Sequence, residues 1–142
     1  MTSDAPRAIL IAEDDPDDTF LIREAWAQVS PRRPLHFVQD GEELMQRLRK
    51  TDLEAAIILL DLNMPRKDGR QALREIKADP QLRRIPVVAF STSRSFSDVA
   101  LAYDLGASSY IVKPPSFDRL LELVRAVEAY WFATVQLPPT VV

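Results

Sequence analysis

Six consecutive apolar residues, 55–60, end abruptly on a carboxylate, Asp61. A run this short, rich in Ile and Leu and followed by turn-forming residues, is typical of a strand buried on both faces of a parallel sheet, although periodicity alone also allows a piece of buried helix. The following Met64-Pro65 excludes continuation as a helix. A carboxylate at the carboxyl end of a central parallel strand lies where open α/β sheets bind their ligands. Asp61 is therefore the first candidate functional residue, although alone it would more often be a solvated acid.

Short apolar segments alternate with segments of helical periodicity along the rest of the chain. The expected strands are residues 8–12, 35–38, 55–60, 85–90 and 109–112, and the expected helices lie within residues 16–30, 41–50, 69–78, 98–105 and 117–132. Such alternation with short connections favours an α/β fold with helices on both faces of a parallel sheet. Because crossovers are right-handed, few topologies remain. We expect a doubly wound five-stranded sheet in the order 2-1-3-4-5, with five helices.

The size and composition of the chain narrow its class. With 142 residues, 46% of them hydrophobic, the chain has the size of one ordinary domain, and we expect a single domain. Its formal net charge of -3, with basic and acidic residues interspersed, argues against a nucleic-acid partner. The absence of cysteine excludes disulfides and thiolate chemistry. Without a leader-like or membrane-spanning apolar run, the sequence predicts a cytoplasmic protein with no membrane partner.

Polar residues stand where four of the expected strands end. Glu13 and Asp14 follow the first strand, Asp61 the third, Ser91 the fourth and Lys113 the fifth. Because the carboxyl ends of parallel strands share one edge of the sheet, these side chains should converge. Several carboxylates in one crevice repel one another unless a cation intervenes. Hard oxygen ligands without Cys or a nearby His favour Mg²⁺ or Mn²⁺ over Zn²⁺.

Such a site is suited to phosphoryl transfer. Asp61 can act as a nucleophile that becomes an acyl phosphate, while the metal and the Lys113 ammonium neutralise the charge of the transferred group. The Ser91 hydroxyl can donate a hydrogen bond to a phosphoryl oxygen.

Three motifs in this order resemble the signature segments of bacterial two-component response regulator receiver domains. They are IAEDD at residues 11–15, LLDLNMP at 59–65 and YIVKP at 110–114. The resemblance covers about residues 8–132 and leaves 133–142 as a tail. It implies a flavodoxin-like fold and a phosphoprotein that works as a switch in phosphorelay signalling. It also implies these site residues: Asp61 as phosphoacceptor; Glu13, Asp14, Asp61 and the Asn63 main-chain carbonyl as Mg²⁺ ligands; Ser91 and Tyr110 as the switch pair; Lys113 as the family's lysine; and Thr92 beside the acyl phosphate.

A narrower resemblance concerns single-domain regulators of the bacterial phytochrome-associated type. It is carried by PRKDGR at residues 65–70, by IPVV at 85–88 together with STS at 91–93, and by YWF at 130–132 together with Leu137-Pro138. The kinases of that group sense light through a bilin. Thr92 is bulkier than the small residue usual in receivers, which could slow attack on the acyl phosphate, and Asp15 stands where this group often has Asn.

We expect a phosphoacceptor switch rather than an enzyme, with at most self-phosphorylation and autodephosphorylation activity. A sensor histidine kinase, phytochrome-type by resemblance, would supply the phosphoryl group. The main alternative is a Mg²⁺-dependent phosphatase of the haloacid dehalogenase type, but such enzymes usually carry an acid two residues after the nucleophile, where this chain has Asn63. A purely structural receiver is disfavoured by the complete set of acids, hydroxyl and lysine.

Several other residues have simpler interpretations. Asp17 and Asp18 are better explained as acids at a helix N-terminus than as ligands. His36 is expected on a half-exposed strand and Trp26 in the core. Basic residues from Arg66 to Arg84 alternate with acids and favour a solvated helix face. The last helix carries more apolar residues than one stripe requires, so we expect a homodimer through this helix and its neighbours.

Overall fold

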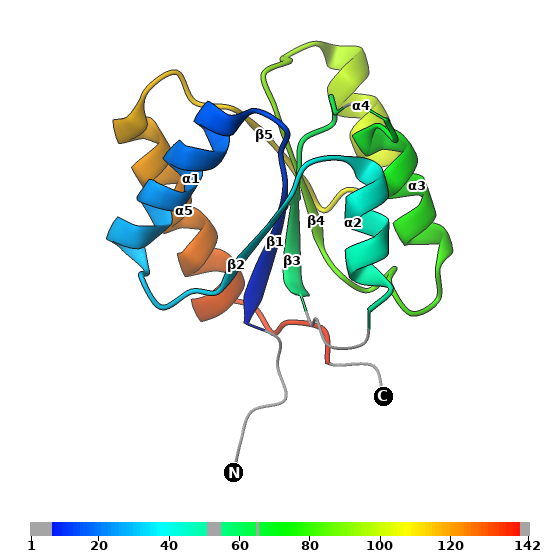
Figure 1. Ribbon diagram of the computed structural model, residues 1–142, viewed down its shortest axis with the longest axis horizontal. Helices are drawn as coiled ribbons and strands as arrows, with labels where there is room; N and C mark the ends of the chain where they lie inside the picture. Colours follow the sequence, from blue (N-terminus) through cyan, green and yellow to red (C-terminus); the bar gives the residue numbers. More distant parts are fainter. Residues whose placement is uncertain (1–6, 51–54, 65, 140–142) are drawn as a thin grey trace.

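The computed structural model describes residues 7–50, 55–64 and 66–139. Its elements alternate as the sequence predicts (Figure 1). The strands are β1 (Ala8–Ala12), β2 (Leu35–Val38), β3 (Ala55–Leu60), β4 (Val87–Ser91) and β5 (Ser109–Val112), and the helices are α1 (Pro16–Val29), α2 (Gly41–Leu48), α3 (Gly69–Ala78), α4 (Phe96–Asp104) and α5 (Phe117–Ala133). The strand expected at 55–60 is confirmed, because this run forms β3, and the alternative of a buried helix piece is excluded.

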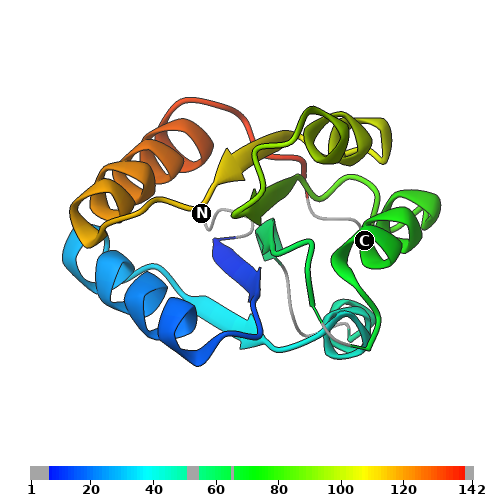
Figure 2. The same cartoon turned by 90° about the horizontal axis from the view of Figure 1, so that it is seen from above.

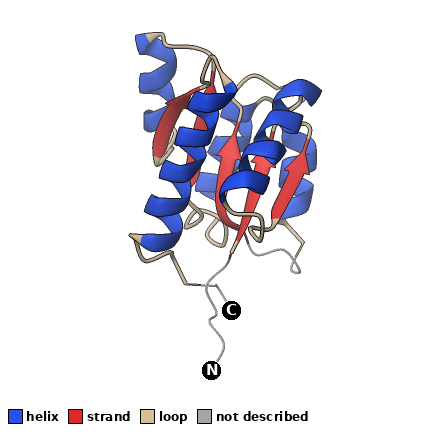
Figure 3. Cartoon of the chain, turned by 90° about the vertical axis from the view of Figure 1, so that its left-hand side faces the viewer, coloured by secondary structure: helices blue, strands red, loops and turns tan. Residues whose placement is uncertain are grey.

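The five strands form one parallel sheet in the order β2-β1-β3-β4-β5, which confirms the predicted topology. Helices α1 and α5 cover one face, and α2, α3 and α4 cover the other (Figure 2). Figure 3, seen from the side of α1 and α5, shows both helices lying over the strands. The fold is therefore a flavodoxin-like doubly wound sheet, and the carboxyl ends of its central strands meet at one edge.

The two central strands are buried on both faces, which explains their continuous apolar sequences. Along β1 and β3, side chains alternate between two cores because successive residues of a strand point to opposite faces. Ile9 and Leu59 pack in the core under α1 and α5, whereas Leu10 and Ile58 pack in the core under α2 and α3. Burial on both sides fixes the register of these strands, and with it the residue at which each one ends.

Two elements begin at other residues than expected. The fourth strand begins at Val87 rather than two residues earlier, because Pro86 lacks an N–H and contributes only its carbonyl, which accepts from Ile58 N at 2.9 Å. Helix α4 begins two residues earlier than expected, because the side chain of Ser95 caps it by accepting from Asp98 N. Helix α2 ends at Leu48, within the expected range of 41–50, and residues 51–54 that follow it lie outside the described residues.

The end of the chain packs back onto the domain. Trp131, Phe132 and Leu137 contact the core under α1 and α5, and the segment after α5 passes beneath the sheet (Figure 1). Tyr130, by contrast, keeps 52% of its surface exposed. Much of the apolar surplus of the last helix is therefore buried within the chain itself. No helix of the described ranges is long and apolar enough to cross a bilayer.

Candidate functional site

The expected site residues meet at the carboxyl edge of the sheet. Glu13 follows β1, Asp61 follows β3 and Lys113 follows β5. The Lys113 Nζ atom lies 2.7 Å from Glu13 Oε1 and 3.1 Å from Asp61 Oδ2. Backbone pairing beyond the strands holds this arrangement, because Asp61 N donates to Ala12 O at 3.0 Å and Lys113 N donates to Ser91 O at 2.8 Å. One ammonium group thus bridges acids that are 48 residues apart in the sequence.

Three carboxylates form a compact acidic cluster at this edge. Oxygen atoms of Glu13, Asp14 and Asp61 all lie within 4.8 Å of one another. Glu13 and Asp61 are only 2% and 6% exposed, whereas Asp14 faces solvent. Two buried acids and one accessible acid make a site that is anchored in the protein and open to an incoming ligand.

The electrostatics of Glu13 indicate which kind of ligand the cluster fits. Burial raises the pKa of Glu13 to about 7 and the charge of Asp61 adds to this, although Lys113 and the Asp15 amide act in the opposite direction. Among the residues that the structure describes, Glu13 Oε1 has no hydrogen-bond partner of suitable geometry despite its closeness to Lys113, a rare condition for a buried oxygen. The donor set therefore fits a hard divalent cation, which would satisfy this oxygen and relieve the repulsion.

Lys113 stays charged in this environment. Burial alone would lower the pKa of Lys113, but its contacts with Glu13 and Asp18 and the charge of Asp61 outweigh burial and raise the pKa above its ordinary value of 10.5. Asp18 Oδ2 lies 2.9 Å from Nζ and accepts a hydrogen bond from it. The sequence places Asp18 only at a helix start, so this contact is a feature that sequence reasoning missed.

The loop after Asp61 is shaped by short-range contacts. Asn63 N donates to Asp61 Oδ1 at 3.0 Å, which fixes the orientation of the carboxylate. Asp68 caps α3 by accepting from Arg70 N at 2.6 Å. Arg66 adopts a positive φ of 64°, which is uncommon outside glycine, and makes the sharp turn between these two points. The loop thus carries the main chain of Asn63 directly beside Asp61.

The hydroxyl and aromatic residues of the site lie around the loop between β4 and α4. Ser91 is buried at the end of β4, and its hydroxyl accepts from Ser93 N at 3.2 Å. Thr92 is exposed. The Tyr110 hydroxyl donates to Ser93 O at 2.9 Å, while its ring packs against the core. Tyr110 therefore holds the same loop that carries Ser91.

A polar network joins this loop to the loop that follows Asp61. Arg70 Nη1 donates to Leu62 O at 3.2 Å and to Asn63 Oδ1 at 3.3 Å, and Arg70 Nη2 lies 3.6 Å from Asp98 Oδ1. Asp98 accepts in turn from the Ser93 hydroxyl at 2.6 Å. Sequence reasoning placed Arg70 in a solvated basic stretch, because no sequence pattern signals a contact between two loops.

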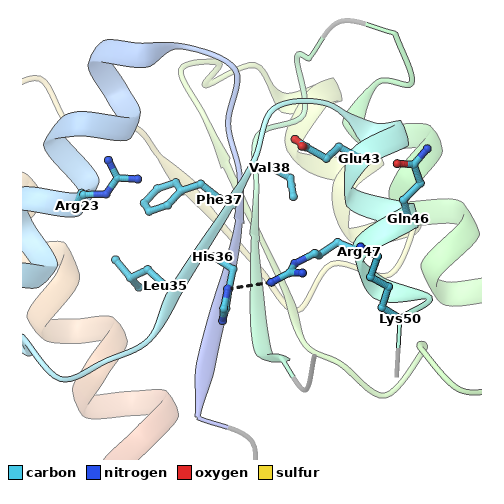
Figure 4. A pocket seen from close by; sticks show the side chains of 9 residues that line it. All are labelled: Arg23, Leu35, His36, Phe37, Val38, Glu43, Gln46, Arg47 and Lys50. Atoms are coloured by element: carbon cyan, nitrogen blue, oxygen red, sulfur yellow. Dashed lines mark hydrogen bonds between the residues drawn. The ribbon is translucent and has the colours of Figure 1, made fainter. Parts of the chain in front are cut away.

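A separate hollow lies at the β2 edge of the sheet and contains none of the expected site residues (Figure 4). It measures about 530 Å³ and lies between the edge strand and the flanking helices α1 and α2. His36 lines it and accepts from Arg47 at 3.2 Å, while the Arg23 guanidinium lies 4.5 Å from the centre of the Phe37 ring. The only histidine in the sequence is thus a half-buried strand residue with a local partner, apart from the acidic cluster.

Comparison with known proteins identifies this arrangement. The family described as the response regulator receiver domain matches residues 9–125. This chain belongs to that family. The receiver domain is 37% identical over 141 residues to the response regulator Rcp1 of Synechocystis sp., and the match covers 96% of each protein.

Solved structures give the same assignment. The crystal structure of the phosphorylated cyanobacterial phytochrome response regulator RcpA superimposes on this receiver domain with a TM-score of 0.88 at 41% identity, covering 94% of this chain and 99% of RcpA. The Mn²⁺-bound form of Rcp1 gives a TM-score of 0.84 at 37% identity, covering 94% and 99%. The receiver domain is thus similar along nearly its whole length to the phytochrome response regulator RcpA and to the response regulator Rcp1, and Rcp1 has been solved with Mn²⁺ bound.

Proposed function

We propose that this receiver domain takes a phosphoryl group from the histidine of a sensor kinase onto Asp61 in a Mg²⁺-dependent reaction, and that the modification switches its binding to a partner. The observation that carries the proposal is the Lys113 ammonium, which touches both Asp61 and Glu13 at the edge where the acids gather. Similarity to phytochrome response regulators supports a bacteriophytochrome as the kinase. Such a kinase would meet the switch in the cytoplasm.

The residues divide the chemistry as follows. An Asp61 carboxylate oxygen attacks phosphorus, the bond from phosphorus to the donor nitrogen breaks, and its electron pair remains on the imidazole, which takes up a proton. Glu13, Asp14, Asp61 and the Asn63 main-chain carbonyl would hold Mg²⁺, or Mn²⁺, which supplies positive charge beside the phosphoryl oxygens. Lys113 pairs with one of these oxygens and the Ser91 hydroxyl donates to another. Thr92, which is exposed and follows Ser91 in the chain, would lie beside the acyl phosphate.

The negative charge of the phosphoryl group on Asp61 would drive the conformational switch. A phosphoryl group brings about -1.5 to -2 charges at neutral pH. Ser91 now accepts from Ser93 N, so reorienting its hydroxyl toward phosphate would alter the loop between β4 and α4. Tyr110 is bonded to that loop through Ser93 O and would follow it. Phosphorylation thereby biases a two-state equilibrium in α4 and β5.

We also propose that the receiver domain forms a homodimer through α5 and neighbouring elements. Tyr130 is the exposed aromatic residue of that helix, although Trp131 and Phe132 already pack inside the chain. Sedimentation of the phosphorylated and unphosphorylated protein tests this proposal, and a monomer in both states at high concentration would refute it.

The central experiment uses phosphoramidate, a small phosphodonor, with Mg²⁺ and intact mass measurement. Wild type should gain one hydroxylamine-labile phosphoryl group, and neither Asp61→Asn nor wild type in EDTA should gain it. A wild type that takes up no phosphate would overturn the proposal. Sustained hydrolysis of a generic phosphate ester would instead favour a hydrolase, because a phosphoacceptor switch does not turn over such substrates.

A further inference from the structure

Asp18 is the third carboxylate on the Lys113 ammonium, and it lies outside the acidic cluster. The Lys113 Nζ atom donates hydrogen bonds to Asp18 Oδ2 at 2.9 Å and to Asp61 Oδ2 at 3.1 Å, whereas its 2.7 Å approach to Glu13 lacks hydrogen-bond geometry. Asp18 and Lys113 also line a hollow of about 100 Å³ whose other walls are mostly apolar. The ammonium thus lies between apolar surface and three acids, and Asp18 makes the shorter of its two hydrogen bonds.

Local structure leaves the Asp18 side chain free for this contact. Asp18 occupies the third position of α1, from which an acidic side chain can reach back to the N–H of the capping residue. Here the capping residue is Asp15, and its N–H already donates to Glu13 Oε2 at 3.1 Å. Asp15 in turn accepts from the amides of Asp17 and Asp18. With the first turn satisfied in this way, the Asp18 carboxylate faces Lys113.

The other two partners of Lys113 have further roles in the proposed function, on which this inference rests. Asp61 would become the acyl phosphate, and Glu13 would be a metal ligand. Asp18 belongs to neither group. We propose that Asp18 is a positioning residue for Lys113, the carboxylate that keeps the ammonium beside the transferred phosphoryl group while Glu13 and Asp61 are engaged elsewhere.

Asp17 provides a matched control for this role. It is also an acid in the first turn of α1, so Asp17→Asn and Asp18→Asn remove the same charge from the same helix terminus. Asp17 is exposed, and the contacts found for Lys113 in the described residues do not include it. A general loss of negative charge near the metal therefore affects both variants, whereas loss of the Lys113 contact affects only Asp18→Asn.

The first readout is the chemical reactivity of Lys113 without metal or phosphodonor. Acetylation by an N-hydroxysuccinimide ester in EDTA, followed by peptide mass spectrometry, measures how freely the amine is available. Because the 2.9 Å hydrogen bond holds the Lys113 ammonium against the Asp18 carboxylate, Asp18→Asn should increase the acetylation rate at Lys113 about threefold or more over Asp17→Asn, and Asp18→Glu should restore protection. Equal rates in the two asparagine variants would overturn the inference.

The second readout is the rate of phosphorylation by phosphoramidate with Mg²⁺. Asp18→Asn should be slower than wild type by about threefold to tenfold, the effect of one partly exposed charge-assisted contact, and Asp18→Glu should recover part of the rate. Asp17→Asn should equal wild type or exceed it, because less negative charge repels the donor. If Asp18→Asn is phosphorylated as fast as Asp17→Asn or faster, the inference about Asp18 is overturned, but the proposed function is not. A wild type without phosphate overturns the proposed function, while the acetylation result still tests the contact.

Discussion

At the scale of single residues, Gly69 determines how closely α3 approaches Asp61. A Cβ atom on Gly69 would overlap Asp61 O and lie 2.7 Å from Leu62 Cα, both of them backbone atoms of the site loop. Gly69 N also donates to Leu62 O at 3.2 Å, which closes the loop onto the helix. A side chain at this position can be accommodated only if the backbone of the site moves.

Gly69→Ala should therefore lower both stability and phosphorylation. Displacing packed backbone atoms typically costs about 1–3 kcal/mol, and we expect a loss of this size in the free energy of unfolding measured by urea titration. The rate of phosphorylation by phosphoramidate should fall in parallel, because the loop carries Asp61 and Asn63. The control is Gln71→Ala, an exposed position of the same helix, which should change stability by less than about 0.5 kcal/mol. Wild-type behaviour of Gly69→Ala would contradict the steric argument.

The two acids at the start of α1 show which contacts of a single residue cannot be predicted from the sequence. Asp17 and Asp18 both follow Pro16 and look equivalent as helix-terminal acids, yet only Asp18 contacts Lys113. Neighbouring residues of a helix point about 100° apart, and which of them faces β5 depends on how α1 packs on the sheet. The strand-end residues Glu13, Asp61 and Lys113 could be predicted to converge because topology alone brings them together.

At the scale of elements, a polar clasp made of Trp26, Arg33 and Glu128 joins the last turn of α1 and the turn before β2 to α5. Arg33 donates to both carboxylate oxygens of Glu128 at 2.9 and 2.8 Å, and the buried Trp26 indole donates to Glu128 Oε2 at 2.8 Å. The Arg33 guanidinium also lies 3.5 Å from the centre of the Phe132 ring. Planar stacking together with bidentate pairing is the geometry for which arginine is suited. The core position of Trp26 could be predicted from its helical spacing, but its partner, 102 residues away, could not.

Glu128→Gln should destabilise the fold in a pH-dependent manner. Burial alone would raise the pKa of Glu128, but hydrogen bonds from Arg33 and Trp26 lower it below the ordinary value of 4.5. The ionised group therefore stabilises the fold above pH 4.5, and this contribution is lost as pH falls through the lowered pKa. Near neutral pH we expect a loss of about 1–3 kcal/mol in urea unfolding, the cost of an unsatisfied partner.

The difference in the free energy of unfolding between wild type and Glu128→Gln should become smaller when the urea titrations are repeated below pH 4.5. The control is Glu122→Gln, an exposed glutamate of the same helix, which should have little effect at any pH. A difference that stays constant with pH would show that the clasp acts through packing rather than through the charge of Glu128.

At the scale of the whole molecule, the fold gathers three acids at one edge of the sheet and places one ammonium group, that of Lys113, against two of them. The sequence predicts this gathering well, because alternating strands and helices fix which strand ends lie together, and every predicted strand is present. The network of Arg70, Asp98 and Ser93 could not be predicted, since it depends on the conformations of two loops. Topology is thus encoded in periodicity, whereas contacts between loops follow only from the assembled fold.

Because the site exists only in the folded chain, Mg²⁺ binding should stabilise the whole molecule. At a Mg²⁺ concentration of a hundred times Kd, linkage predicts an increase of about 2.7 kcal/mol in the free energy of unfolding, reversed by EDTA. Asp14→Asn removes the accessible acid of the cluster and should lose most of this increase, while its stability without Mg²⁺ should equal or exceed that of wild type because one repulsion is relieved. Asp17→Asn should keep the full response. Urea titrations with and without Mg²⁺ measure both quantities, and an equal Mg²⁺ response in Asp14→Asn and wild type would show that the cation binds elsewhere.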